Sequence, residues 1–141
     1  NRMADKKLVV VGEGPERRRL KKMAGRNIIF TGYLERGKLI DVLTKAKGFV
    51  FAAEEDFGIA PVEAQACGVP VIAFGRGGVL ETVIDGKTGL YFYEQTEDAI
   101  IDAIERFEKK SFDMLYMKEH VDKFSREAFI QGFKDIVKKY T

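Results

Sequence analysis

The sequence EEDFGIAPVEAQACG, residues 54–68, decides the fold of this chain. An apolar run at residues 48–53 precedes it and predicts a buried strand. Pro61 suits the first turn of a helix, and Gly68 suits a left-handed cap just past the last turn. The stretch therefore predicts a strand, a tight loop and a helix N-terminus, whose free backbone N–H groups can bind an anion.

The acidic side chains of this stretch indicate the rest of the ligand. Carboxylates repel phosphate, so Glu55 and Glu63 should bind a neutral part that is rich in hydroxyl groups. A carboxylate accepts two hydrogen bonds from a vicinal diol, such as that of a ribose or a hexose. Gly58 lies between the two acids and lacks a Cβ, which lets the backbone approach a ligand closely. We expect a ligand with a diphosphate part and a sugar part.

The remainder of the chain alternates between strands and helices. Apolar runs predict strands at 8–11, 27–31, 48–53, 70–74 and 89–92, and helical spacing predicts helices at 16–24, 38–46, 61–67 and 79–84. Three further helices are expected at 96–110 with Thr96 as its cap, at 111–124 and at 125–140, and residues 1–7 read as the end of a helix. This order predicts an α/β fold with a doubly wound parallel sheet and extra C-terminal helices.

Composition narrows the class of protein. A chain of 141 residues suits one domain, and a net charge of +2 gives no bulk signal for nucleic acid or a membrane surface. No apolar run approaches the roughly 20 residues that span a bilayer. The single cysteine, Cys67, is expected to be a buried thiol rather than a nucleophile, and His120 a surface or core residue without a chemical role.

Five motifs in order carry a family resemblance. They are Glu55 and Glu63 with Phe57-Gly58 between them, and the segments VGEGP at 11–15, FTGY at 30–33, GGVLE at 77–81 and DGKTGL at 85–90. Together they resemble the retaining nucleotide-sugar glycosyltransferases of the GT-B fold, and within these the group 1 type, family 4. The resemblance covers about residues 8 to 93 and implies that residues 1–141 form the Rossmann-like, C-terminal donor-binding domain of a two-domain enzyme.

The resemblance also implies roles for particular residues. Glu55 is implied as the catalytic residue at the donor hexose and Glu63 as the residue that binds the donor ribose, while the backbone after Phe57, at Gly58 and Ile59, binds sugar hydroxyls or the β-phosphate. Gly12 and Gly14 are expected to line the cleft, and Gly32 and Tyr33 to border the nucleobase. A simple strand-end turn remains the alternative for these last four residues.

A GDP- or UDP-linked hexose is the implied donor, with a mannosyl- or glucosyltransferase reaction in polysaccharide or glycoconjugate biosynthesis. The implied acceptor is a hydroxyl group of a glycan or a lipid-linked molecule, bound by an N-terminal domain that this sequence lacks. No metal or other cofactor is expected, since the chain has no Asp-x-Asp motif. No nucleic-acid partner is expected either. We expect a cytoplasmic protein, in which the basic residues of 17–22 either face solvent or make peripheral contact with anionic lipid.

In the family that this chain resembles, the domain begins with a central strand and a helix, whose loop supplies an Arg and a Lys for the diphosphate. Neither precedes Asn1 here, so the sequence reads as a fragment. The last helix, at 125–140, is expected to pack toward the other half of the enzyme. The isolated chain should therefore bind donor weakly and turn nothing over.

Two other functions stay open at the level of sequence. A nucleotide-sugar epimerase with the GT-B architecture would share the donor fold. A non-catalytic α/β interaction module of the response-regulator type would need a phosphorylatable Asp at the end of the third strand, where Glu54 and Glu55 stand instead.

Overall fold

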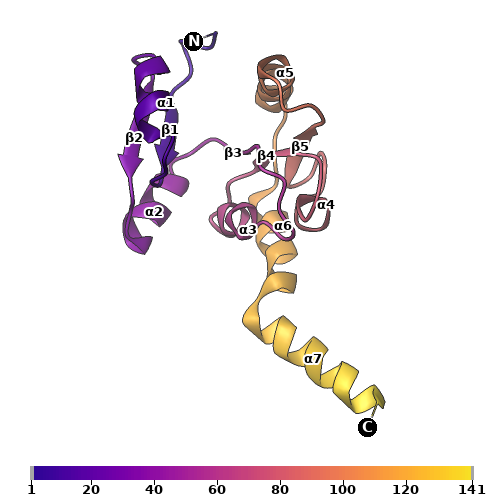
Figure 1. The fold of residues 1–141 in the computed structure, drawn as a ribbon. Helices are drawn as coiled ribbons and strands as arrows, with labels where there is room; N and C mark the ends of the chain where they lie inside the picture. The colour runs from indigo at the N-terminus through magenta and orange to yellow at the C-terminus, as the bar shows by residue number, and fades with distance from the viewer. Residues whose placement is uncertain (1, 141) are drawn as a thin grey trace. The chain divides into compact units, whose positions relative to one another are not determined.

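The computed structural model describes residues 2–140 (Figure 1), and it divides between Val42 and Leu43 into two compact units. Each unit contains parallel strands with helices between them. The predicted α/β class is therefore confirmed, with the strands pairing in two sets, β1-β2 and β3-β4-β5.

The first unit is built on two parallel strands. β1 (Leu8–Val11) pairs with β2 (Ile28–Gly32), with Leu8 opposite Ile28 and a break in the register between Val10 and Val11. Helix α1 (Arg17–Met23) connects the strands and has no buried residue, and α2 (Arg36–Leu43) follows β2. A continuous apolar run is typical of a strand that is buried on both faces. Leu8 and Ile29 are nevertheless exposed, because two strands alone do not bury both faces of a sheet.

Residues 2–7 do not form the end of a helix, so the expectation was wrong for these residues, and Asn1 lies outside the described chain. They form a turn in which the Lys6 N–H donates to the Met3 carbonyl at 3.1 Å. The Asn27 side-chain amide donates to the carbonyl oxygens of Met3 at 3.0 Å and Lys6 at 2.6 Å. These bonds from another segment fix the turn, and local sequence does not show them.

The second unit contains a three-stranded parallel sheet in the order β3 (Phe49–Phe51), β4 (Val71–Phe74), β5 (Gly89–Phe92). Every residue of β4 and β5 is buried, as their unbroken apolar runs predict. Helix α5 (Glu97–Glu108) covers one face, and its Ala103 and Phe107 pack against Ile72, Phe74, Leu90 and Phe92. Helices α3 (Ile59–Ala66), α4 (Val79–Thr82) and α6 (Met114–Val121) lie on the other face (Figure 1).

The helix ends follow from their caps. Thr96 caps α5 as predicted, since its side chain accepts from the Ala99 N–H at 3.3 Å. Helix α6 was expected from Ser111 but begins at Met114, because Asp113 is the residue whose side chain accepts from the first free N–H groups. Gly68 has the predicted left-handed φ of 77° after α3.

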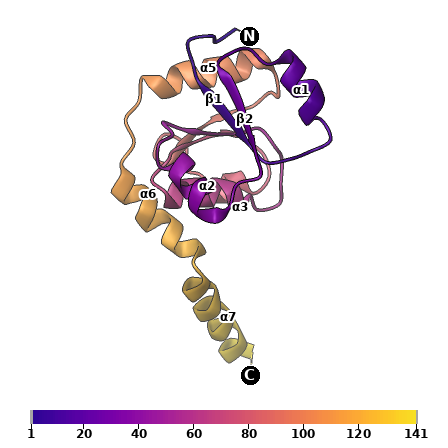
Figure 2. The same cartoon turned by 90° about the vertical axis from the view of Figure 1, so that its left-hand side faces the viewer.

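The chain ends in a 3₁₀ turn, η1 (Asp122–Phe124), and the helix α7 (Arg126–Tyr140). Helix α7 extends away from the sheet of its unit in both views (Figure 1 and Figure 2), and none of its residues is buried. Its apolar side chains include Phe129, Phe133 and Ile136, which are all exposed. The helix thus presents an apolar face that the described chain does not cover.

Candidate functional site

The acidic loop lies at the carboxyl end of β3, where ligands bind in open α/β sheets. The side-chain amide of Gln95, which follows β5, donates to the Ala52 carbonyl at 2.7 Å and so holds the start of the loop. Gly58 ends the loop with a left-handed φ of 78° and no side chain to cap the helix. Helix α3 begins at Ile59, two residues before the prediction, and Pro61 still lies in its first turn.

A second loop, between β4 and α4, supports the acidic loop through backbone contact. The Gly78 N–H donates to the Glu55 carbonyl at 2.7 Å. A Cβ at Gly77 would lie 2.5 Å from that same carbonyl oxygen, and a Cβ at Gly78 would lie 2.3 Å from the Asp56 carbonyl oxygen. Such distances leave room only for glycine, so this pair holds the shape of the loop.

Glu55 and Glu63 are both exposed, one at the carboxyl end of the sheet and one just after the first turn of α3. Within the described residues, neither carboxylate has a hydrogen bond or an ion pair. Neither acid is therefore occupied by the fold, and both carboxylates can accept hydrogen bonds from a ligand.

Cys67 ends α3 as a half-buried thiol. Burial raises the pKa of this thiol, and the negative charge of Glu63 raises the pKa further. Since the thiolate is the nucleophilic form, these shifts agree with the interpretation that Cys67 has no nucleophilic role.

Phe57 and Ile59 flank Gly58 and are exposed, at 43% and 65% of their residue surface respectively. The Phe57 ring packs edge to face on Phe124 of η1, with ring centroids 5.7 Å apart at 76°. Phe124 follows in the chain by more than sixty residues and carries no local motif, so sequence reasoning missed it.

The other predicted binding residues belong to the first unit, at the carboxyl ends of its two strands. The Gly12 N–H donates to the Gly32 carbonyl at 2.8 Å, and both glycines have positive φ. Gly14 has open space around its Cα, and Tyr33 is 77% exposed. The structure thus brings Gly12 and Gly32 together, with Tyr33 next to them on the surface.

A charged pair lies against this glycine contact. Glu13 Oε2 and Arg17 Nε are 3.3 Å apart, and a Cβ at Gly32 would lie 2.5 Å from Glu13 Oε1. Within the basic segment of α1, Arg19 also pairs with Glu16. Sequence reasoning treated this segment as a solvated or lipid-binding face and missed the contact with Gly32, which a four-residue spacing of opposite charges could have indicated.

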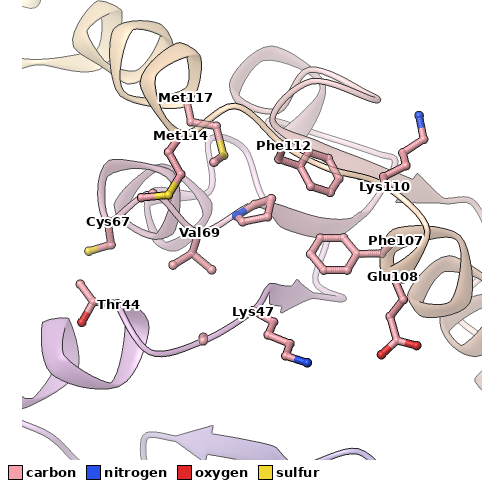
Figure 3. A pocket seen from close by; sticks show the side chains of 13 residues that line it. Thr44, Lys47, Cys67, Val69, Phe107, Glu108, Lys110, Phe112, Met114 and Met117 are labelled. Carbon is pink, nitrogen blue, oxygen red and sulfur yellow. The ribbon is translucent and has the colours of Figure 1, made fainter.

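A cavity of about 600 Å³ lies at the opposite, amino ends of β3 and β4 (Figure 3). Its lining includes Lys47, Cys67, Phe107 and Met114. None of the predicted site residues lines it, so the cavity does not form part of the candidate site.

The described helices include none that is both long and apolar enough to cross a bilayer. Residues 2–140 also contain no group of three or more His, Cys, Asp or Glu side chains placed to hold a metal ion.

Comparison with known proteins identifies relatives across nearly the whole chain. Alpha-1,3/1,6-mannosyltransferase ALG2 of Dictyostelium discoideum is 42% identical over 90 residues, which cover 60% of this chain and 21% of that protein. The GDP-mannose-dependent alpha-(1-6)-phosphatidylinositol monomannoside mannosyltransferase of Mycolicibacterium smegmatis is 35% identical over 116 residues, which cover 73% of this chain and 30% of that protein.

Among solved structures, sucrose-phosphate synthase from Thermosynechococcus elongatus aligns with a TM-score of 0.75 and 29% identity. The alignment covers 95% of this chain and 38% of that one. The chain thus spans well under half the length of each of these three proteins.

The sequence profile of the family described as glycosyl transferases group 1 matches residues 2–129. This match includes both strand sets, the acidic loop and both carboxylates. The chain belongs to the glycosyl transferases group 1 family.

Proposed function

We propose that this chain is the donor-binding part of a retaining hexosyltransferase, which moves a sugar from a nucleoside diphosphate to a hydroxyl acceptor. One observation carries the proposal. Two exposed carboxylates, Glu55 and Glu63, stand free of structural partners on either side of a helix N-terminus that glycine leaves uncapped. The family match favours transfer over the epimerase and interaction-module alternatives.

Each part of the loop has a role in this proposal. Glu63 accepts hydrogen bonds from the ribose diol, and Glu55 does so from the hexose that is transferred. The free N–H groups around Gly58 and Ile59 face the β-phosphate, where the helix dipole stabilises the negative charge of the leaving diphosphate. No proton transfer is assigned to the described residues.

For the first unit, taken by itself, we propose contact with the nucleobase of the donor. Gly12 and Gly32 bring two strand ends together without side chains, which lets a flat ring approach the backbone. Tyr33 adds an exposed aromatic ring beside them. We assign Gly32 and Tyr33 to the base, and Gly12 and Gly14 to the wall of the cleft.

The choice of donor rests on the relatives. Two of them are mannosyltransferases, and the name of one states that it depends on GDP-mannose. A GDP-linked hexose is therefore the first donor to test and a UDP-linked hexose the second. We propose that donor binding needs no metal, that a glycan or a lipid-linked acceptor is bound by further parts of the protein, and that the enzyme is cytoplasmic with at most peripheral membrane contact.

Calorimetric titration of the chain with GDP, UDP and ADP tests the donor role. We expect weak binding of one diphosphate, no change on adding EDTA and no sugar transfer by residues 1–141 alone. Glu63→Gln removes a charged hydrogen-bond acceptor and should weaken binding by about 10- to 100-fold, which is the range for hydrogen bonds to charged groups.

Glu105→Gln is the matched control, because Glu105 is also an exposed helical glutamate but lies on α5. The Glu105→Gln variant should bind the diphosphate with the same affinity as the wild type. Equal affinity for Glu63→Gln as well would refute the ribose role of Glu63.

A further inference from the structure

Two buried side chains meet at one carbonyl oxygen, that of Thr82 at the C-terminal end of α4. Gln65 Nε2 donates to the Thr82 carbonyl at 2.9 Å and also lies 3.1 Å from the Pro61 carbonyl. His120 Nε2 lies 3.0 Å from the same Thr82 oxygen. Since a carbonyl oxygen only accepts, His120 Nε2 is the donor in this bond.

Helix α4 joins this carbonyl to the acidic loop. Thr82 is the last residue of α4 and Gly78 is its N-cap, so the helix is a single turn. Its N-terminal end contacts the acidic loop, because the Gly78 N–H donates to Glu55 and a Cβ at Gly78 would lie 2.4 Å from the Phe57 Cα. The Thr82 hydroxyl also donates back to the Gly78 carbonyl at 3.3 Å.

A second route runs from His120 to the same loop through two aromatic contacts. The His120 ring packs edge to face on Phe124, with centroids 5.5 Å apart at 81°. Phe124 in turn packs edge to face on Phe57. The contacts form a closed ring from the acidic loop through α4, His120 and Phe124 back to the loop.

We propose that His120 and Gln65 are positioning residues that hold the acidic loop in its donor-binding shape through α4 and Phe124. A single helical turn is not stable by itself, and its last carbonyl groups have no partner within the helix. Two buried donors on one of these carbonyls satisfy it and fix where α4 lies. Among the described residues Gln65 Oε1 and His120 Nδ1 have no partner, so the bonds that these two side chains donate are what holds the geometry.

This inference rests on the proposed function for the meaning of the loop, but the ring of contacts can be tested without a ligand. Hydrogen exchange at the Gly78 amide reports whether the bond to Glu55 stays closed. His120→Leu removes the N–H donor and places an apolar side chain in the buried position, whereas His120→Gln retains a side-chain N–H donor at a similar distance from the backbone. We expect faster Gly78 exchange in His120→Leu and wild-type exchange in His120→Gln.

Nucleotide affinity is the second measurement, made by titration with GDP and UDP. His120→Leu should weaken the binding seen in the wild type by about tenfold, the size expected for one lost hydrogen bond to the network. His120→Gln should restore it to about the wild-type value. A role in stability alone would not be rescued in this selective way.

Met117→Ala is the matched control. Met117 is also buried on α6, and in the described chain it takes part in none of these hydrogen bonds or ring contacts. This variant should melt at a lower temperature while its Gly78 exchange and its affinity stay as in the wild type. Wild-type values of both in folded His120→Leu, or equal changes in Met117→Ala, would overturn the inference.

Phe124→Leu keeps the inference testable if His120→Leu does not fold. Phe124 is only half-buried, so the fold tolerates its change more easily. Faster hydrogen exchange at Gly78 in Phe124→Leu supports the route through the aromatic contacts of Phe124. Unchanged exchange together with unchanged nucleotide affinity contradicts the inference. If the wild type binds no diphosphate, the proposed function fails, while the exchange data still decide the positioning role.

Discussion

Tyr91 lies buried on β5, and its hydroxyl is within hydrogen-bond distance of the carbonyl oxygens of Val79 and Val83 at the two ends of α4. Burial, together with the negative charge of Asp85 and the nearby Tyr93, raises the pKa of Tyr91 from its usual 10.0 to about 12. The folded protein therefore favours the neutral phenol. This residue links β5, an edge strand of the sheet, to the helix that supports the acidic loop.

The raised pKa of Tyr91 predicts a loss of stability in alkali. The neutral Tyr91 side chain contributes fully to the free energy of unfolding below about pH 10, where it is neutral in both the folded and the unfolded state. This contribution is lost as the pH rises toward 12, because Tyr91 ionises first in the unfolded chain. Tyr91→Phe should lower the free energy of unfolding at pH 8 by about 1 kcal/mol for the lost hydrogen bond. Between pH 10 and 12 the free energy of unfolding of Tyr91→Phe should fall less steeply than that of the wild type, as measured by urea unfolding at each pH.

The two proteins share all their other ionisable groups, so the comparison is between the slopes of their pH dependence. Tyr116→Phe is a control, because that ring is only half-buried. Parallel slopes for wild type and Tyr91→Phe would contradict the assignment.

Helix α6 depends on its cap more than on its propensity. Asp113 Oδ1 accepts from the N–H groups of Leu115 at 2.8 Å and Tyr116 at 3.1 Å. These are two of the N–H groups that have no partner within the helix. Since α6 carries His120, the cap that fixes the start of α6 also fixes the position of His120.

Asp113→Ala should destabilise the chain by about 1 kcal/mol, which is the usual cost of losing a capping side chain. Ser111→Ala is its control, because Ser111 lies nearby and is a capping type of residue, yet the helix does not start at it. Thermal unfolding followed by circular dichroism measures both. An equal loss for Ser111→Ala would show that the helix begins earlier than the structure has it.

At the scale of the whole molecule, the apolar residues divide into two groups. Phe92 is 2% exposed in the core between α5 and the sheet, whereas Phe133 on α7 is 60% exposed. Phe129 and Phe133 stack on each other with centroids 6.4 Å apart, but no residue of α7 is buried. In this chain, α7 therefore adds little to the stability of its unit.

Phe133→Ala should change the free energy of unfolding of this chain by less than about 0.5 kcal/mol, as for other surface substitutions. Phe92→Ala should cost about 3–5 kcal/mol, since it opens a cavity in the core. In a longer protein that also carries the partner half expected from the sequence, Phe133→Ala should be costly, because α7 is expected to pack on that half. A large loss in the chain alone would contradict the exposed position of α7.

The local elements could be predicted from sequence, because their signals are local. Continuous apolar runs placed β1 and β5 with correct bounds, Thr96 marked the start of α5, and Gly68 marked the end of α3. The acidic stretch likewise predicted a strand, a loop and a helix around Glu55 and Glu63. Spacing and backbone preference are sufficient for such features, since both act within a few residues.

The support of the loop could not be predicted in this way, because it depends on contacts between distant segments. Gln95 reaches Ala52, and Phe124 reaches Phe57 from a helix that follows the sheet. His120 looked like a residue without a chemical role, yet it shares a carbonyl with Gln65 across two helices. Burial and hydrogen bonding of such groups exist only after the chain has packed, so the tertiary structure alone decides them.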